Sequence, residues 1–284
     1  MDNASTDDTA LVLQNAHLPN LAMRCLREPR QGVSLARNRG LAAAGGEVIL
    51  FTDDDVAPAG DWLERLATPL WQGDCDAAVG RIELAAELSR PWMQARHKRW
   101  LAAPDLSVDQ MTELIGANMG FHRRVLERVP AFDPELGTGA LGSGEETLFS
   151  FQLSEAGYRL RFIPDAVVVH HPDPNRLLRA RWLEAARKQG RSLAYILHHW
   201  EHAELKWPFI RFCYMALKLG VRRKIDPTPP LDAKGIPDWE MSYVVELEEY
   251  RQFLQERKRS RNYAKHGLLR LGVPPGADPP AHAS

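Results

Sequence analysis

The sequence of 284 residues contains little cysteine. Its three cysteines, Cys25, Cys75 and Cys213, are far apart and odd in number. They form neither the paired spacing of a zinc site nor the even set of a disulfide framework. Because structural disulfides are rare where thiols are kept reduced, we expect a cytoplasmic protein without a disulfide scaffold.

Long apolar runs and a secretory signal are also lacking. The sequence contains no segment in which a basic start precedes an apolar centre and a cleavage site. The most apolar late stretch, 207–221, includes Arg211 and Lys218 and is too short to span a bilayer. Such a segment either lies along a membrane surface or packs inside the protein, and the sequence favours a core helix.

Neither sign of charge dominates the whole chain, but the two signs are unevenly distributed. Lysine and arginine total 36 and aspartate and glutamate total 37. Residues 1–175 hold 16 basic and 25 acidic side chains, whereas residues 176–265 hold 19 basic and 11 acidic ones. The acidic part is a poor surface for nucleic acid and can hold divalent cations. The basic part suits phosphates, anionic lipid or an acidic partner.

A short apolar run ends in polar residues near the start of the chain. In 46–55, GEVILFTDDD, the apolar residues from Val48 onward predict a buried strand. Segment 32–46 has alanine and leucine at helical spacing, and Asp61 opens another short helix. This alternation is typical of an α/β fold, which places ligands at the carboxyl ends of its strands. Further strands are predicted at 75–84, 158–164 and 166–171.

Three adjacent carboxylates, Asp53, Asp54 and Asp55, follow the first predicted strand. In an extended backbone Asp53 and Asp55 point the same way and Asp54 points the other way. Asp53 and Asp55 can therefore hold one Mg²⁺ or Mn²⁺ and leave coordination sites for substrate phosphates. The alternative is a solvated turn that caps the next helix.

Two glutamates and two histidines are further candidates. Glu145 and Glu146 follow a glycine-rich segment, 137–144, and begin a helix. They are either ordinary acidic residues of a first helical turn or a general base on a mobile loop. His170 and His171 end an apolar run, where a histidine is either a hydrogen-bonded structural residue or a ligand that joins the carboxylates.

Taken together, four stretches resemble the family 2 glycosyltransferases, which have the GT-A fold. Residues 2–9, DNASTDDT, are similar to the segment after the family's second strand. Residues 32–58 are similar to its Gly-x-x-x-Ala-Arg-Asn-x-Gly helix and its strand ending in Asp-x-Asp. Residues 116–137 carry its Gly-Ala-Asn and Phe-Asp pattern, and 142–171 carry its Gly-Glu-Asp helix, Ala-Gly-Tyr turn and closing histidine. The resemblance covers residues 2–175.

The resemblance implies roles for individual residues. It implies a nucleotide pocket formed by Asp2, Asn3, Arg37, Asn38, Asp53 and Asp54. It implies a cation site formed by Asp53, Asp55 and His170, with His171 as the alternative to His170. Asn118 would lie near the transferred sugar. Glu146 stands at the family's usual Asp, the general base, and Glu145 precedes it; the longer side chain leaves the choice between them open.

The implied reaction is transfer of a sugar from a UDP-, GDP- or dTDP-sugar to an acceptor hydroxyl. The acceptor would be a glycan or a lipid-linked molecule, as in cell-envelope polysaccharide synthesis. Glu146 would accept the hydroxyl proton during a single displacement with inversion, and Mg²⁺ or Mn²⁺ would stabilise the leaving nucleoside diphosphate. Because no carboxylate is obviously placed as a covalent nucleophile, a retaining route is less economical.

We predict three parts in the chain. Residues 1–175 form the GT-A-like domain, a Rossmann-like mixed sheet flanked by helices. Residues 176–265 form a basic helical extension, which either docks on the inner face of an anionic membrane or covers the acceptor side of the catalytic domain. Residues 266–284 form a disordered tail rich in proline. By the resemblance, we also expect the family's first strand, helix and second strand to be missing from the chain.

Two other functional classes remain as alternatives. A nucleotidyltransferase also combines an α/β sheet with metal-binding carboxylates, but it is expected to carry an early glycine-rich, basic loop, which is not visible in the sequence. A non-catalytic relative would bind a nucleotide or a partner enzyme without transferring sugar. The motifs favour the glycosyltransferase.

Overall fold

A mixed sheet forms the centre of the computed structural model, which describes residues 1–16, 22–107 and 113–272. Its strands lie in the order β3 (Val48–Thr52), β6 (Asn118–His122), β5 (Ala77–Leu84), β7 (Leu160–His170) and β4 (Val56–Pro58). β5 and β7 are parallel, and the other neighbouring pairs are antiparallel. A separate parallel pair consists of β1 (Asp2–Asn3) and β2 (Arg27–Glu28).

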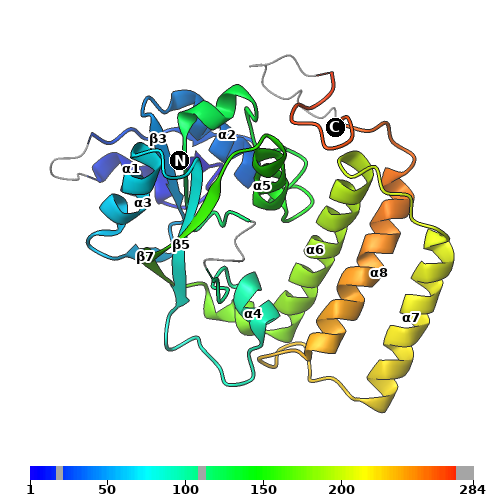
Figure 1. Ribbon diagram of the computed structural model, residues 1–284. Coiled ribbons are helices and arrows are strands. Elements are labelled where there is room, and N and C mark those ends of the chain that lie inside the picture. The colour runs from blue at the N-terminus through cyan, green and yellow to red at the C-terminus, as the bar shows by residue number, and fades with distance from the viewer. Residues whose placement is uncertain (17–21, 108–112, 273–284) are drawn as a thin grey trace.

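Helices cover both faces of the five-stranded sheet (Figure 1). Because side chains alternate along a strand, Ala77 and Val79 of β5 face one cluster and Ala78 faces another. The first cluster includes residues of α2 (Val33–Ala43) and α5 (Glu145–Glu155), and the second includes residues of α3 (Trp62–Trp71). The remaining short helices are α1 (Thr9–Asn15), α4 (Ala95–Trp100), η2 (Arg123–Glu127) and η3 (Pro174–Leu177).

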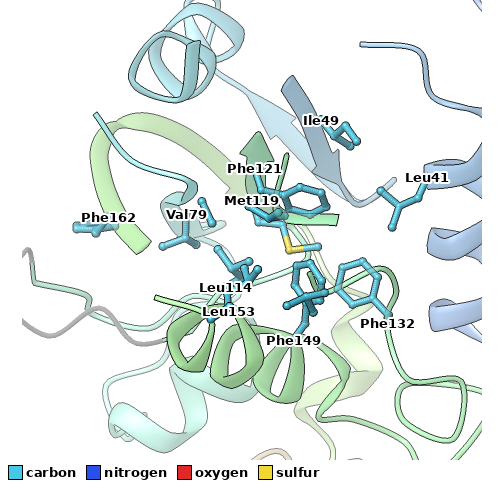
Figure 2. Packing of buried hydrophobic residues seen from close by; sticks show 14 residues of the cluster. Leu41, Ile49, Val79, Leu114, Met119, Phe121, Phe132, Phe149, Leu153 and Phe162 are labelled. Carbon is cyan, nitrogen blue, oxygen red and sulfur yellow. The ribbon is translucent and has the colours of Figure 1, made fainter. Parts of the chain in front are cut away.

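The larger of these clusters is rich in phenylalanine. Figure 2 shows Phe121, Phe132 and Phe149 packed around Met119. The rings of Phe132 and Phe149 lie 4.4 Å apart between centroids. Phe132 follows β6 in the chain, whereas Phe149 belongs to α5. This contact therefore ties α5, and the two glutamates at its start, to the sheet.

Most of the predicted elements are confirmed. The helix expected in 32–46 is α2, the strand expected in 46–55 is β3, and the strand expected in 75–84 is β5. The two strands expected at 158–164 and 166–171 are one continuous strand, β7. The pairing register shifts between Gly80 and Arg81, where Ile163 and Val167 are the successive partners. Pro164 thus falls in a bulge, where it removes no ladder hydrogen bond.

Three long helices follow the sheet and lie side by side, with α8 between the other two (Figure 1). They are α6 (Arg179–His199), α7 (Pro208–Ile225) and α8 (Asp238–Glu256). α6 and α8 approach closely at Gly190, because a Cβ there would lie 2.4 Å from the carbonyl oxygen of Val245. Among the described residues, no helix is long and apolar enough to cross a membrane.

The expectation of a core helix at 207–221 is wrong. Within α7, only Pro208, Met215 and Leu219 are buried. The helix packs against α8 on one side, so most of its remaining apolar side chains face solvent. Whether an apolar helix is buried depends on which other elements pack against it, and the local sequence pattern does not show this.

Part of the predicted tail is held against the domain. Residues 266–272 are described, and Arg270 forms ion pairs with Asp133 and Glu135. Both carboxylates precede the glycine-rich segment that leads to α5. The rest of the predicted tail, 273–284, lies outside the described residues.

Candidate active site

A cavity of about 690 Å³ opens beside the start of α5. Arg37 of α2, Asp53 at the end of β3 and Glu145 and Glu146 of α5 line one part of it. α6 lines another part, with side chains that include Trp182 and Lys188. The fold therefore brings together three groups that the sequence analysis names as site residues: Arg37, Asp53 and the pair of glutamates. They lie about 15 to 110 positions apart in the sequence. α6, from the basic extension, covers this cavity.

Arg37 joins the two glutamates. Its Nη1 lies 2.9 Å from Oε1 of Glu145, and its Nη2 lies 3.0 Å from Oε1 of Glu146. The side chains of Arg37 and Glu145 are 9% and 7% exposed, whereas that of Glu146 is 22% exposed. Glu146 also accepts the backbone N–H of Gly116 at 3.2 Å. Glu146 is thus the glutamate that is both fixed and accessible from the cavity.

The environment separates the pKa values of the two glutamates. Burial, followed by the charge of Glu146, raises the pKa of Glu145 well above its usual range. Burial is also the largest single effect on Glu146 and acts to raise its pKa, but the charge of Arg37 and the hydrogen bonds to Glu145, to the backbone and to Arg37 together outweigh it, so the net direction is downward. These opposite shifts favour Glu145 as the member of the pair that holds a proton and Glu146 as the member that carries the charge. Oε2 of Glu145 is buried and has no hydrogen-bond partner among the described residues.

Glycines allow this arrangement. A Cβ on Gly116 would lie 1.9 Å from Nη2 of Arg37 and 2.6 Å from Oε1 of Glu146, so a side chain there would displace the ion pair. Gly144 precedes α5 with φ of 90°, a left-handed conformation that glycine adopts without strain. A Cβ on Gly142 would lie 2.3 Å from Cγ of Lys188 in α6. The loop that the sequence predicts to be mobile is therefore packed closely against α6.

Asp55 and His170 form a second polar group. Nε2 of His170 lies 3.2 Å from Oδ2 of Asp55, and Nδ1 of the same ring lies 2.6 Å from the carbonyl oxygen of Leu101. Pairing of β4 with β7 places the two residues next to each other, because Val56 is opposite His170. His171 instead points to Glu87, with Nδ1 3.5 Å from its Oε1, and is about half exposed. Of the two histidines, the structure brings His170 to Asp55.

The three predicted aspartates differ in their surroundings. Asp53 lines the cavity and is itself exposed; partial desolvation there raises the pKa of its carboxyl while the charge of Arg37 acts in the opposite direction. Asp55 is half-buried against His170, and Asp54 is exposed. Within the described parts of the chain, no group of three or more His, Cys, Asp and Glu side chains is gathered closely enough to hold a metal by itself.

Several predicted site residues lie elsewhere. Asn118 is fully buried, with its amide bonded to Trp62 Nε1 and to the carbonyls of Arg81 and Ala166. Asn38 exchanges two hydrogen bonds with the backbone of Phe132. Both amides therefore brace the fold, and neither residue lines the cavity described above.

The residues at the start of the chain also serve local structure. Oδ1 of Asp2 accepts the N–H of Ser5 at 3.0 Å. The amide of Asn3 donates to the carbonyl of Arg30 at 2.6 Å and accepts the N–H of Gly32 at 2.9 Å. Asn3 thus fixes the turn that leads into α2, which carries Arg37.

Sequence reasoning missed several groups of the site. Gly116 belongs to the Gly-Ala-Asn pattern, yet nothing local shows that Arg37 and Glu146 meet above it. Trp100 and Trp182 stack at one wall of the cavity, with ring centroids 6.4 Å apart. In the sequence, these two residues could have been noticed because each is a large aromatic side chain in an otherwise polar segment.

Comparisons with known proteins agree with the motifs. Residues 1–129 match the family model described as glycosyl transferase family 2. A pre-mycofactocin glycosyltransferase of Mycobacterium tuberculosis is 29% identical over 148 residues, which make up 49% of this chain and 30% of that protein. The succinoglycan biosynthesis protein ExoM of Rhizobium meliloti is 29% identical over 181 residues, 60% of this chain and 56% of ExoM. The chain therefore spans between 30% and 56% of the length of these curated relatives.

A solved structure shares the fold. The mannosyltransferase PcManGT from Pyrobaculum calidifontis, solved in complex with GDP-Man and Mn²⁺, superposes with a TM-score of 0.56 at 20% sequence identity. The match covers 89% of this chain and 76% of that protein. Residues 1–129 thus match the family 2 glycosyltransferases, and the likeness to PcManGT supports a GT-A fold for the chain.

Proposed function

We propose that this protein transfers a sugar from a nucleoside diphosphate sugar to an acceptor hydroxyl with inversion. The observation that carries the proposal is the pair of glutamates on Arg37 at the wall of the cavity, where the side chain of Glu146 is 22% exposed and that of Glu145 only 7%. The opposite directions of their pKa shifts favour Glu146 as the ionised member. A general base must be ionised and within reach of the proton that it removes. Glu146 meets both requirements.

In the proposed step, Glu146 accepts the proton of the acceptor hydroxyl while its oxygen bonds to the anomeric carbon. The bond from that carbon to the diphosphate breaks at the same time, and its electron pair leaves with the diphosphate. Arg37 keeps Glu146 ionised and oriented. Glu145, whose pKa is raised well above its usual range, would hold a proton and so add no second negative charge beside the base.

The residues at Asp55 fit a divalent cation. Nδ1 of His170 faces a carbonyl oxygen, which only accepts, so Nδ1 carries the proton and a neutral ring turns the lone pair of Nε2 toward Asp55. The lone pair of His170 Nε2 and the Oδ2 atom of Asp55 face each other at 3.2 Å. Two neighbouring ligands of one Mg²⁺ ion also lie about 3 Å apart, so this spacing suits two ligands of the same ion. Asp55 and His170 would supply two ligands to Mg²⁺ or Mn²⁺, and because no third such side chain of the described residues is gathered with them, the remaining ligands would come from the bound donor. The bound ion would supply positive charge to the departing diphosphate.

The donor and acceptor follow from the relatives as proposals. PcManGT was solved with GDP-Man and Mn²⁺, which supports a nucleotide-sugar donor for this fold. ExoM is named for succinoglycan biosynthesis, which supports a glycan acceptor. The cavity of about 690 Å³ is within the range of small-molecule binding sites.

Calorimetric titration tests the proposal without knowledge of the acceptor. UDP, GDP and dTDP are titrated into the protein with and without Mn²⁺. We expect one nucleotide to bind more tightly with Mn²⁺ present, and the corresponding nucleotide sugar to be turned over by the wild type and not by Glu146→Gln. Absence of metal-dependent binding for all three nucleotides would contradict the proposal. Binding without turnover would favour the non-catalytic relative.

A further inference from the structure

One side of α7 carries an uninterrupted apolar stripe. Ile210, Tyr214, Leu217, Val221 and Ile225 recur at spacings of four, three, four and four residues. Such spacing places the five side chains on one face of a helix. Their exposed fractions lie between 46% and 75%. Single exposed apolar residues are ordinary, but a contiguous row along a whole helix of about 27 Å marks an interaction surface.

The rest of the described chain does not cover this stripe. α7 is anchored on α8 through Met215 and Leu219, which are buried, and through two cation–π contacts. Nζ of Lys218 lies 4.5 Å from the ring centroid of Tyr243, and the guanidinium of Arg222 lies 5.3 Å from that of Trp239. These contacts fix the rotation of α7, so its apolar stripe stays on the side away from α8.

The charges on α7 itself have one sign, and one of them, Arg222, also pairs with Asp226 just beyond the helix at 3.3 Å. α7 contains five basic residues and no aspartate or glutamate. Arg211, Lys218 and Arg222 each follow a residue of the stripe by one position, so they line a single edge of it. Lys224 lies near the opposite edge. An apolar band between basic edges complements a surface that offers negative charge above apolar material.

We propose that α7 docks this protein on an anionic lipid bilayer, lying in the plane of the headgroups with its apolar stripe inserted. The helix is not apolar enough to cross the bilayer, and its hydrophobic side is already oriented by α8. A second copy of the chain is a poorer partner, because face-to-face packing would bring two basic edges together. This role is separate from sugar transfer.

Vesicle sedimentation tests the docking with a matched control. The protein is mixed with vesicles of phosphatidylcholine alone or with added phosphatidylglycerol, in the absence of any donor. Leu217→Ser removes an exposed leucine from the stripe, and Leu63→Ser removes a comparably exposed leucine, 58% against 67%, from α3. We expect binding to the anionic vesicles, weakened about tenfold in Leu217→Ser and unchanged in Leu63→Ser. Binding should also fall as the salt concentration rises.

The two exposed cysteines give a second readout. Cys213 lies in α7 and Cys25 lies near β2, and both are exposed. An environment-sensitive fluorophore on Cys213, in a Cys25→Ser background, should shift to the blue with anionic vesicles. The same label on Cys25, in a Cys213→Ser background, should not shift.

Three results would overturn the docking proposal. The first is no binding of the wild type to either kind of vesicle. The second is equal binding by Leu217→Ser and the wild type when circular dichroism shows that both proteins are folded. The third is dimerisation in sedimentation velocity that is lost in Leu217→Ser, without binding to vesicles. The last would assign the stripe to a contact between copies. Because no nucleotide is present, none of these results bears on the catalytic proposal.

Discussion

The guanidinium of Arg37 lies 3.0 Å from Oε1 of Glu146, and its charge is the largest of the effects that lower the pKa of this half-buried carboxyl. The same guanidinium lies 5.5 Å from the ring centroid of Phe132, so the core fixes its position. Burial would otherwise favour the protonated carboxyl. The electrostatics of the proposed base thus depend on a residue of a different helix.

Removal of this charge should change the pH dependence of turnover. In Arg37→Gln, burial is no longer compensated and the pKa of Glu146 rises. A base with a raised pKa stays protonated up to a higher pH. When the rate of donor turnover is plotted against pH, the fall in rate on the acidic side should therefore move to higher pH. Arg37→Lys retains a charge and should move this fall less. An unchanged position of the fall in a folded Arg37→Gln variant would contradict the role of Arg37.

The two glutamates should respond differently to the same substitution. Glu146→Gln replaces the ionised carboxylate by a neutral amide that cannot act as a base, and turnover should fall by about 10²- to 10⁴-fold. Glu145→Gln replaces a protonated carboxyl by a neutral amide of the same shape, so turnover should change only a few-fold. Single-turnover rates at saturating donor measure both. The reverse order of effects would move the base to Glu145.

Local sequence patterns could predict the elements around the site. The glycine stops, the apolar run at β3 and the helix start at Asp61 are signals that span a few residues, and α2, β3 and α3 lie where these signals place them. The pairing of Arg37 with Glu145 joins residues 108 positions apart. No local pattern encodes it, and the motif alone assigned Arg37 to the nucleotide.

Polar residues in motifs were the hardest to interpret. Asn38 and Asn118 belong to family patterns, yet their amides are bonded to backbone groups inside the fold. A buried amide must satisfy its donors and acceptor, and only the packed chain shows which partners it has. The histidine doublet was likewise ambiguous until the pairing of β4 with β7 placed His170 beside Asp55.

The histidines provide a matched test of the cation site. His170→Gln removes the ring nitrogen that faces Asp55, whereas His171→Gln alters an exposed neighbour. We expect the Mn²⁺-dependent part of nucleotide binding to weaken about 10- to 100-fold in His170→Gln and to stay unchanged in His171→Gln. Calorimetric titration measures both, with circular dichroism as the control for folding. Equal affinities in the two variants would remove His170 from the site.

Two helical glycines should differ in the sign of their effect on stability. In Gly190→Ala the new Cβ would meet the carbonyl of Val245 at 2.4 Å and push α6 away from α8, which should lower the free energy of unfolding by about 1–3 kcal/mol. At Gly220 in α7 a Cβ would meet no atom within 4 Å, so Gly220→Ala should raise it by about 0.5–1 kcal/mol. Urea denaturation measures both. Destabilisation of similar size in both variants would show that α6 and α8 are not in close contact at Gly190.

The stability of the three-helix layer should depend on pH through Glu249. Burial, together with the charge of Glu246, raises the pKa of Glu249 to about 7 in the folded protein. The unfolded chain has the lower, ordinary value, so the folded state binds more protons between the two pKa values. Stability is therefore fully present below the unfolded pKa and is lost as pH rises through about 7.

Glu249→Gln mimics the protonated side chain and should be insensitive to this titration. At pH about 8 the variant should exceed the wild type by roughly 2 kcal/mol in the free energy of unfolding, and at pH about 5 the two should be nearly equal. Glu204→Gln, at an exposed position, is the control and should match the wild type at both pH values. Urea denaturation at the two pH values measures the difference. A stabilisation by Glu249→Gln that is the same at both would mean that the Glu249 carboxyl does not titrate in this range.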